Sequence, residues 1–135
     1  MSKITWNFVT KLTDKNCINA FEQKYKFSLP NDLQECIKKN NGGVPEPYTL
    51  LIEINNEKVF GGLLSFNVLD SENVYKIIDI LDLFDGNHLK FLPFGIDPFG
   101  NYFCLNNNKI YFYNHETENS IYICDTFTEF LAKLK

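Results

Sequence analysis

Apolar residues in the first quarter of the chain recur at three- and four-residue intervals, which is the spacing of one helix face. Ile18, Phe21 and Tyr25 show this spacing downstream of Asp14, a residue type that often caps helix N-termini. These positions predict a first helix that is capped by Asp14 and buries a narrow apolar stripe.

A second helix is predicted directly after Leu29-Pro30, because proline suits the first turn of a helix and disfavours helical backbone in the residue before it. Asn31 or Asp32 can cap this helix. Its apolar face consists of Leu33, Cys36 and Ile37. The helix is expected to end at Asn40-Asn41-Gly42-Gly43, where one of the two glycines takes the left-handed backbone of a C-cap.

Residues rich in strand formers predict strands at 48–54 and 58–66, joined by a turn at the asparagines 55–56. The glycine pair 61–62 indicates a bulge or a bend in the second strand. Ser71 can cap a further helix, which is expected to close at residues 86–87. The apolar positions of that helix are Val74, Ile77, Ile78, Leu81 and Phe84.

Three more strands are predicted at residues 102–105, 109–113 and 120–124, with an earlier strand at residues 90–94 left open. A last helix follows the capping box formed by Thr126 and Glu129. Helices grouped around consecutive hairpins indicate a single α+β domain that spans all 135 residues. We expect a mainly antiparallel sheet of five to six strands with helices packed on it.

A two-residue turn at residues 107–108 would set the pairing of the strands on either side of it. The expected pairs are Phe103–Phe112, Cys104–Tyr111 and Leu105–Ile110, followed by Phe112–Ile123 if the next strand continues antiparallel. Alternation along these strands leaves one apolar face for helices to cover. The opposite face collects Tyr102, Tyr111, Tyr113 and Tyr122, together with Cys104 and Cys124.

This tyrosine-rich face is a candidate binding surface, since tyrosine is enriched at protein interfaces and suits both wet and dry surroundings. The alternative is that another helix, or the N-terminal segment with Trp6 and Phe8, covers it. Asp79 and Asp82 lie three residues apart on the predicted third helix and share a polar face. They form either an ordinary solvated face or an acidic patch for a basic partner.

Composition favours a packed core and a protein partner over nucleic acid. Hydrophobic residues make up 44% and aromatic residues 16% of the chain, which is ample for a core. The formal net charge is −4, and every basic residue is a lysine. Because arginine is the usual residue for gripping phosphate and reading guanine, nucleic-acid binding is not expected. A partner with a basic surface is the better electrostatic match.

The four cysteines, Cys17, Cys36, Cys104 and Cys124, are far apart and form no CxxC motif. The N-terminus lacks the apolar core of a signal peptide, and no apolar run is long enough to span a bilayer. We therefore expect a cytoplasmic protein with reduced thiols and no membrane partner, and we favour a monomer.

The sequence contains no recognisable catalytic motif. His88 and His115 are the only histidines, and no metalloprotease, Walker-type, nucleophile-elbow or dinucleotide motif occurs. On the predicted hairpin His115 lies roughly 13 Å from Cys104, which is too far for proton transfer. The spacing of histidines and cysteines also suits no compact metal site. We expect no catalytic residue, no cofactor and no metal.

Four segments, taken in order, resemble the SUKH superfamily, which includes the Smi/Knr-like cell-wall regulators of yeast and many bacterial immunity proteins. Leu29-Pro30 opens a helix, and Asn41-Gly42-Gly43 closes it. The third segment is Pro93-Phe94-Gly95-Ile96-Asp97 followed by Gly100-Asn101, and the fourth is Asp125-Thr126-Phe127 leading to Phe130-Leu131. The resemblance is strongest over residues 22–131.

The resemblance implies an antiparallel sheet with packed helices that recognises other proteins and has no catalytic motif. Many bacterial relatives look like immunity proteins that neutralise a toxin, often a nuclease. The leading hypothesis is an immunity protein that binds a basic toxin domain through a tyrosine-centred patch ringed by carboxylates. A regulatory or scaffold domain of the cell-wall-regulator type is the second hypothesis. A small hydrolase or nucleotide-binding enzyme is the third.

Overall fold

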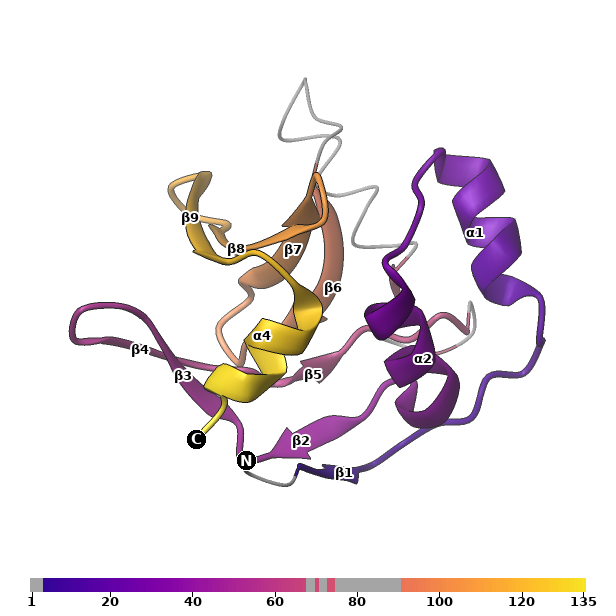
Figure 1. Ribbon diagram of the computed structural model, residues 1–135, viewed down its shortest axis with the longest axis horizontal. Helices are drawn as coiled ribbons and strands as arrows, with labels where there is room; N and C mark the ends of the chain where they lie inside the picture. The colour runs from indigo at the N-terminus through magenta and orange to yellow at the C-terminus, as the bar shows by residue number, and fades with distance from the viewer. Residues whose placement is uncertain (1–3, 68–69, 71–72, 75–90) are drawn as a thin grey trace.

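A five-stranded antiparallel sheet, whose strands neighbour one another in chain order, forms the centre of the protein (Figure 1). The computed structural model describes residues 4–67, 70, 73–74 and 91–135. The strands of the central sheet are β5 (Gly62–Leu63), β6 (Leu92–Ile96), β7 (Tyr102–Asn106), β8 (Lys109–Asn114) and β9 (Asn119–Cys124). The sequence left open whether a strand forms at residues 90–94, and the structure has a strand there, β6, which begins at Leu92.

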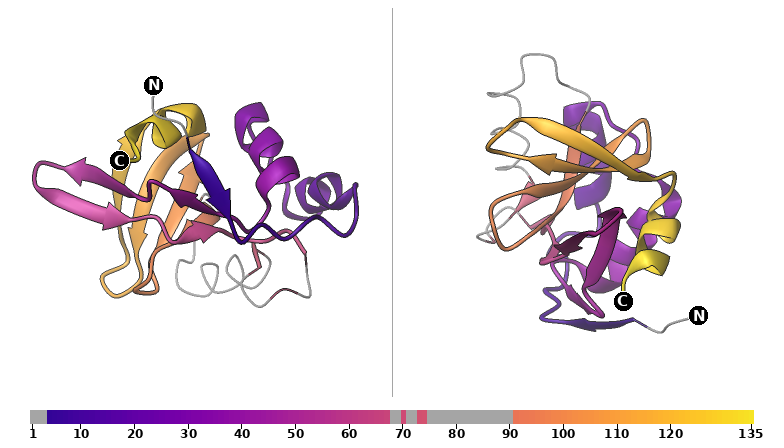
Figure 2. Two further views of the ribbon diagram at one scale, coloured as in Figure 1. Left: turned by 90° about the horizontal axis from the view of Figure 1, so that it is seen from below. Right: turned by 90° about the vertical axis from the view of Figure 1, so that its left-hand side faces the viewer.

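Two two-stranded antiparallel sheets and three described helices surround the central sheet. β1 (Thr5–Asn7) pairs with β2 (Val44–Glu46), and β3 (Thr49–Glu53) pairs with β4 (Asn56–Val59). The helices are α1 (Cys17–Tyr25), α2 (Asn31–Asn40) and α4 (Phe127–Lys133). α4 lies across one face of the central sheet with α2 beside it, while the β3–β4 hairpin projects away from the body (Figures 1 and 2). The α+β prediction with mainly antiparallel sheets is confirmed.

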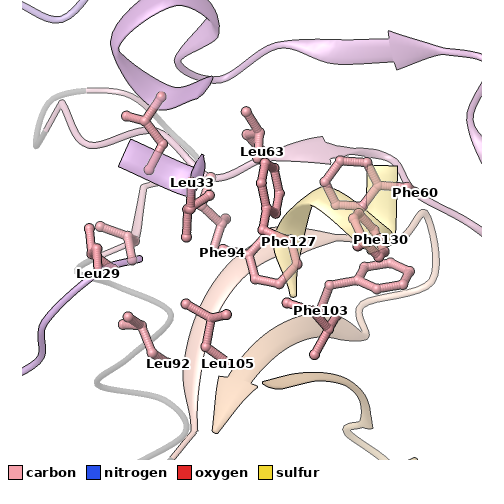
Figure 3. Packing of buried hydrophobic residues seen from close by; sticks show 14 of the residues in the cluster. Leu29, Leu33, Phe60, Leu63, Leu92, Phe94, Phe103, Leu105, Phe127 and Phe130 are labelled. Carbon is pink, nitrogen blue, oxygen red and sulfur yellow. The ribbon is translucent and has the colours of Figure 1, made fainter. Parts of the chain in front are cut away.

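The core between α4 and the sheet is built mainly from phenylalanine rings (Figure 3). Phe60 lies edge-on to Phe103 and to Phe130, with ring centroids 5.1 Å apart in both pairs. Phe94 packs in the same way against Phe127 at 5.6 Å. Edge-to-face packing of buried rings adds stability beyond the burial of their area. These contacts fix α4 on the sheet.

Gly95 on β6 makes this close packing possible. A Cβ atom added at Gly95 would lie 2.2 Å from Cε1 of Phe60, which is far inside van der Waals contact. Only glycine lets the Phe60 ring approach the strand this closely. The close approach of the Phe60 ring therefore explains why glycine occupies position 95 in the middle of β6.

The second helix begins and ends close to the predicted positions, but its cap differs. Pro30 occupies the N-cap, and neither Asn31 nor Asp32 caps the helix with its side chain, so that prediction is wrong. Asp32 instead reaches across to α4 and accepts hydrogen bonds from the backbone N–H of Thr128 at 2.9 Å and from its hydroxyl at 2.8 Å. Its carboxylate thus satisfies a free N–H in the first turn of another helix.

The end of α2 confirms the glycine prediction. Asn41 has φ −49° and ψ 129°, Gly42 has φ +71°, and the N–H of Gly43 donates to the carbonyl of Asn40 at 2.8 Å. This is a type II turn, whose third position needs a positive φ and therefore favours glycine. The predicted cap of the first helix is wrong: α1 starts at Cys17 with Asn16 as its N-cap, and Asp14 instead accepts from the N–H of Asn16 at 2.9 Å in the turn before the helix.

Two strand predictions needed correction in the first half of the chain. Glu53 pairs with Asn56, so the hairpin turn is formed by Ile54 and Asn55 and not by residues 55–56. The predicted strand 58–66 is divided at its glycine pair into β4 and β5, which belong to different sheets. The bend indicated by the glycines is confirmed, and it is sharp enough to end one sheet and start another.

The register predicted for β7 and β8 is confirmed, whereas the register predicted for β8 and β9 is wrong. Asn107 and Asn108 both have positive φ, at 53° and 67°, and all three predicted pairs between β7 and β8 are present. On the next strand Phe112 pairs with Ile121 and not with Ile123, two residues from the predicted register, and a bulge beyond Tyr111 makes Cys124 the partner of Ile110. Cys124 therefore joins the apolar core, and its predicted place on the tyrosine face is wrong.

The predicted helix that starts at Ser71 and carries Asp79 and Asp82 lies outside the described residues.

Candidate functional site

The four predicted tyrosines lie on the outer face of the central sheet, but they differ in exposure. Tyr113 is 4% exposed and belongs to a small second cluster with Cys104, whereas Tyr122 is 47% exposed. Tyr102 and Tyr111 are intermediate. The sheet therefore brings the four side chains to one face, and that face runs from a buried end at Tyr113 to an open end at Tyr122.

Three rings on this face stand edge-on to one another, and we call Phe91, Tyr111 and Tyr122 the aromatic row. The centroids of Phe91 and Tyr111 are 5.6 Å apart at an interplanar angle of 89°. Those of Tyr111 and Tyr122 are 5.8 Å apart at 74°. Each ring restricts its neighbour, so the exposed Tyr122 is presented on an ordered base. Sequence reasoning missed Phe91 because it precedes β6 and the predicted strand pairs did not include it.

The predicted cover of this face by the N-terminal segment is wrong, and its cover by the predicted third helix concerns residues outside the described ones. Trp6 and Phe8 do not form it, since Trp6 packs against the main core and Phe8 is almost fully exposed. Among the described residues, Phe91 covers Tyr111 and also contacts Tyr113 at a centroid distance of 6.1 Å. Within the described part of the chain, Phe91 is the ring that packs on Tyr113, while Tyr122 is 47% exposed.

Carboxylates surround the open end of the row. The hydroxyl of Tyr122 donates a hydrogen bond to Asp125, which raises the pKa of Tyr122 to about 12; the charges of Asp125 and Glu129 act in the same direction. Lys109 lies 3.7 Å from Asp125 in an exposed ion pair. Asp125 follows β9 directly, three residues after Tyr122, and that proximity in sequence was the available signal for this pair. The predicted carboxylates Asp79 and Asp82 lie outside the described residues.

The cysteines have little nucleophilic character. All four are free, as expected, and burial raises the pKa of the Cys36 and Cys124 thiols to about 11. Burial also raises the pKa of Cys17 and, more strongly, that of the fully buried Cys104. A thiol with a raised pKa is mostly protonated at neutral pH and a weak nucleophile. In the part of the chain that the structure describes, no group of three potential metal ligands is present.

The model of the SMI1 / KNR4 family (SUKH-1) matches residues 13–133. This range covers both described helices before the sheet, the whole central sheet and α4. The chain belongs to this family. A search of the curated proteins finds no match. Of the helices in the described ranges, none combines the length and apolar character of a membrane span.

In this SUKH-1 domain the residues that carried the resemblance have structural roles. Leu29 is buried, and its N–H donates to Oε2 of Glu22 at 2.7 Å, which fixes the link between α1 and α2. Gly95 admits the Phe60 ring, and Gly42 makes the turn after α2. These residues explain why the fold forms and do not themselves mark a binding surface.

Asp97 and His115, which could have lined an enzyme pocket, are joined through Asn101. The buried Asp97 accepts from the N–H groups of Phe99 and Asn101, both at 2.8 Å, and from the Asn101 amide at 2.9 Å. That amide orientation leaves Oδ1 of Asn101 to accept from the backbone N–H of His115 at 3.0 Å and from Nδ1 at 2.8 Å. Three donors satisfy the carboxylate, and the arrangement ties the β6–β7 turn to the β8–β9 turn.

Proposed function

We propose that this SUKH-1 domain is a non-catalytic protein-binding module, an immunity protein that neutralises a bacterial toxin by binding it directly. The observation that carries the proposal is the aromatic row, in which the exposed Tyr122 packs on Tyr111 and Tyr111 packs on Phe91. Tyr122 would insert into the partner while Tyr111 and Phe91 keep it in place. The family's bacterial relatives that resemble immunity proteins support the same role.

A preordered tyrosine suits tight binding for two physical reasons. Its ring offers a large contact area with only two side-chain torsions to fix, so little conformational entropy is lost on binding. Such anchors dominate interfaces, where truncation of a central tyrosine typically costs about 2 kcal/mol or more. The packing of Tyr122 against Tyr111 at 5.8 Å reduces the ordering cost further.

The charges beside the row favour a basic partner. Asp125 and Glu129 are both exposed next to Tyr122, and Lys109 offsets only part of their charge. Exposed carboxylates of this kind mainly speed association, and salt screens their effect over about 10 Å at 0.1 M. We therefore expect association, more than dissociation, to depend on salt.

Binding kinetics against a basic toxin domain, sought first among the products of neighbouring genes, would test the proposal. Tyr122→Ala should raise the dissociation rate, whereas Glu129→Gln should mainly slow association at low salt. Ile54→Ala is the matched control, because Ile54 is exposed at the tip of the projecting β3–β4 hairpin. If Tyr122→Ala remains folded and binds like the wild type, the interface lies elsewhere.

A toxin-activity assay separates neutralisation from mere binding. An immunity protein abolishes the toxin's activity at a one-to-one ratio, and Tyr122→Ala should restore that activity. A complex that leaves the toxin fully active would contradict the immunity role and favour the regulatory or scaffold alternative of the cell-wall-regulator type.

A further inference from the structure

A groove lined with lysines lies on another part of the molecule, away from the aromatic row. Lys11 and Lys15 come from the segment between β1 and α1, and Lys38 and Lys39 come from the last turn of α2. With Leu12 as its apolar part, the groove has a volume of about 440 Å³. We call these five residues the lysine groove. The segment before α1 runs beside the C-terminal end of α2 (Figure 1).

Buried amides hold the two sides of the groove together. Asn41, 1% exposed, donates from its amide to the carbonyl of Thr10 at 3.0 Å, and the N–H of Thr10 donates to the carbonyl of Asn41 at 2.8 Å. Asn67, also buried, donates to the carbonyl of Lys11 at 2.8 Å and accepts from the N–H of Thr13 at 2.9 Å. An extended segment with no helix or strand of its own is thus fixed on α2.

Among the described residues, the groove lysines make little close contact with carboxylates. The described carboxylate within 4.0 Å of a groove lysine is that of Glu35, which lies 3.5 Å from Lys38. Both partners of that pair are more than half exposed, so the interaction is weak. The dipole of α2 accounts for lysines in its last turn, but it gives no reason for Lys11 and Lys15, which belong to another segment. A groove lined by one sign of charge raises the local concentration of oppositely charged ligands.

We propose that the lysine groove binds an acidic peptide segment of a protein partner, with glutamate or aspartate side chains on the lysines and an apolar side chain on Leu12. This site is separate from the aromatic row and does not depend on the proposed function. Its volume lies within the range of small-ligand sites, about 300 to 1,000 Å³, and suits a few side chains of a bound segment.

The chemistry of the lining favours a peptide over nucleic acid. Lysine is a hydrated point charge and lacks the planar fork with which arginine grips a phosphate. Binding of single-stranded nucleic acid relies on aromatic rings that stack on bases, and no ring is among the five residues of the groove. Carboxylates paired with lysines around an apolar contact fit the groove better.

Fluorescence anisotropy with a labelled short peptide, glutamates flanking a central leucine, provides the direct test. The same peptide with glutamines in place of the glutamates is the ligand control. Lys11→Gln combined with Lys39→Gln should weaken binding by about tenfold at low salt. Lys24→Gln combined with Lys133→Gln removes the same charge from the last turns of α1 and α4 and should leave the affinity within about twofold.

Each outcome of this experiment supports or overturns the binding of an acidic peptide at the lysine groove. Retained affinity in the arginine versions of Lys11 and Lys39 supports a charge-based site and rules out loss of fold as the cause. Equal weakening by both pairs of glutamine substitutions would show attraction to the whole protein and overturn the site. Absence of peptide binding, or tighter binding of a short RNA of equal charge, would also overturn it.

Discussion

The two faces of the central sheet use alternate residues of the same strands and have opposite characters. On the inner face Phe103, Leu105, Ile110 and Phe112 are all almost completely buried beneath α4 and its neighbours. On the outer face the tyrosines range from buried to half exposed. The chain alternates phenylalanine with tyrosine along β7 and β8, so a single hydroxyl separates side chains of nearly equal size. The hydroxylated ring is placed where the sheet is only partly covered.

We therefore expect changes on the inner face to affect stability and changes at the exposed end of the outer face to affect binding. Removal of an inner ring leaves a cavity in a closed core, whereas removal of Tyr122 leaves no cavity because solvent already reaches that ring. The outer face is itself divided, since Tyr113 is buried with Cys104 and Tyr122 is open. Variants of Tyr113 on β8 and of Tyr122 on β9 therefore test packing at one end of the outer face and binding at the other.

Phe103→Ala should cause the largest loss of stability, about 4 kcal/mol in the free energy of unfolding. Phe103 is fully buried, and its ring contacts Phe60, Phe112 and Phe130 at centroid distances of 5.1, 5.3 and 5.5 Å. Urea denaturation followed by circular dichroism measures the change. Phe99→Ala is the control, because Phe99 is 75% exposed and its loss should cost less than about 0.5 kcal/mol. Similar losses for both would contradict the description of the inner face as the stabilising one.

Tyr113→Ala should cost about 3 kcal/mol, since it removes a buried ring from the cluster with Cys104. Tyr122→Ala should change the free energy of unfolding by less than about 1 kcal/mol, because that ring is half exposed. The same denaturation experiment compares them. Equal costs would mean that the outer face is one uniform surface, and a binding defect of Tyr122→Ala could then be a folding defect.

Gly95→Ala should destabilise the inner face by about 1 to 3 kcal/mol through overpacking. Its new Cβ would lie 2.2 Å from the Phe60 ring, which is held on other sides by Phe103 and Phe130 and has no room to move away. Combining it with Phe60→Leu, which removes the clashing ring, should cost less than the sum of the two single changes. Additive costs would show that Gly95 is required for a reason other than the approach of Phe60.

Local signals predicted the inner face well and the partners of distant residues poorly. The Asn107-Asn108 turn fixes the β7–β8 register because both residues must adopt positive φ in a two-residue loop. The bulge on β9 has no comparable sequence signature, so the side taken by Cys124 was predicted wrongly. Asp32 was expected to cap its own helix, and only the tertiary fold reveals that it binds α4, which is 96 residues away at Thr128.

The candidate sites follow the same rule. Alternation placed the tyrosines on one face, but it could not predict how far each is covered, because Phe91 reaches Tyr111 from outside the predicted strand pairs. The lysine groove could not be predicted, since it depends on the buried amides of Asn41 and Asn67 that bring two distant segments together. Side-chain periodicity reports faces of one element, whereas both sites are made between elements.

The smallest expected effect concerns the open end of the outer face. The pKa of Tyr122 is raised from 10.0 to about 12, chiefly by its hydrogen bond to Asp125. Asp125→Asn removes the negative charge, so the pKa should fall toward 10.0. Because the folded state holds this proton more tightly than the unfolded state, the stabilising contribution is complete below pH 10 and is lost as the pH rises to about 12. Asp125→Asn should therefore reduce the loss of stability within that pH range.

Ultraviolet absorbance of tyrosinate during a pH titration measures this change, and Tyr122→Phe identifies which part of the titration belongs to Tyr122. If Asp125→Asn left the titration assigned to Tyr122 unchanged, the hydroxyl would not be held by Asp125. The open end of the aromatic row would then rest on ring packing alone, and Asp125 would be free to meet a basic partner directly.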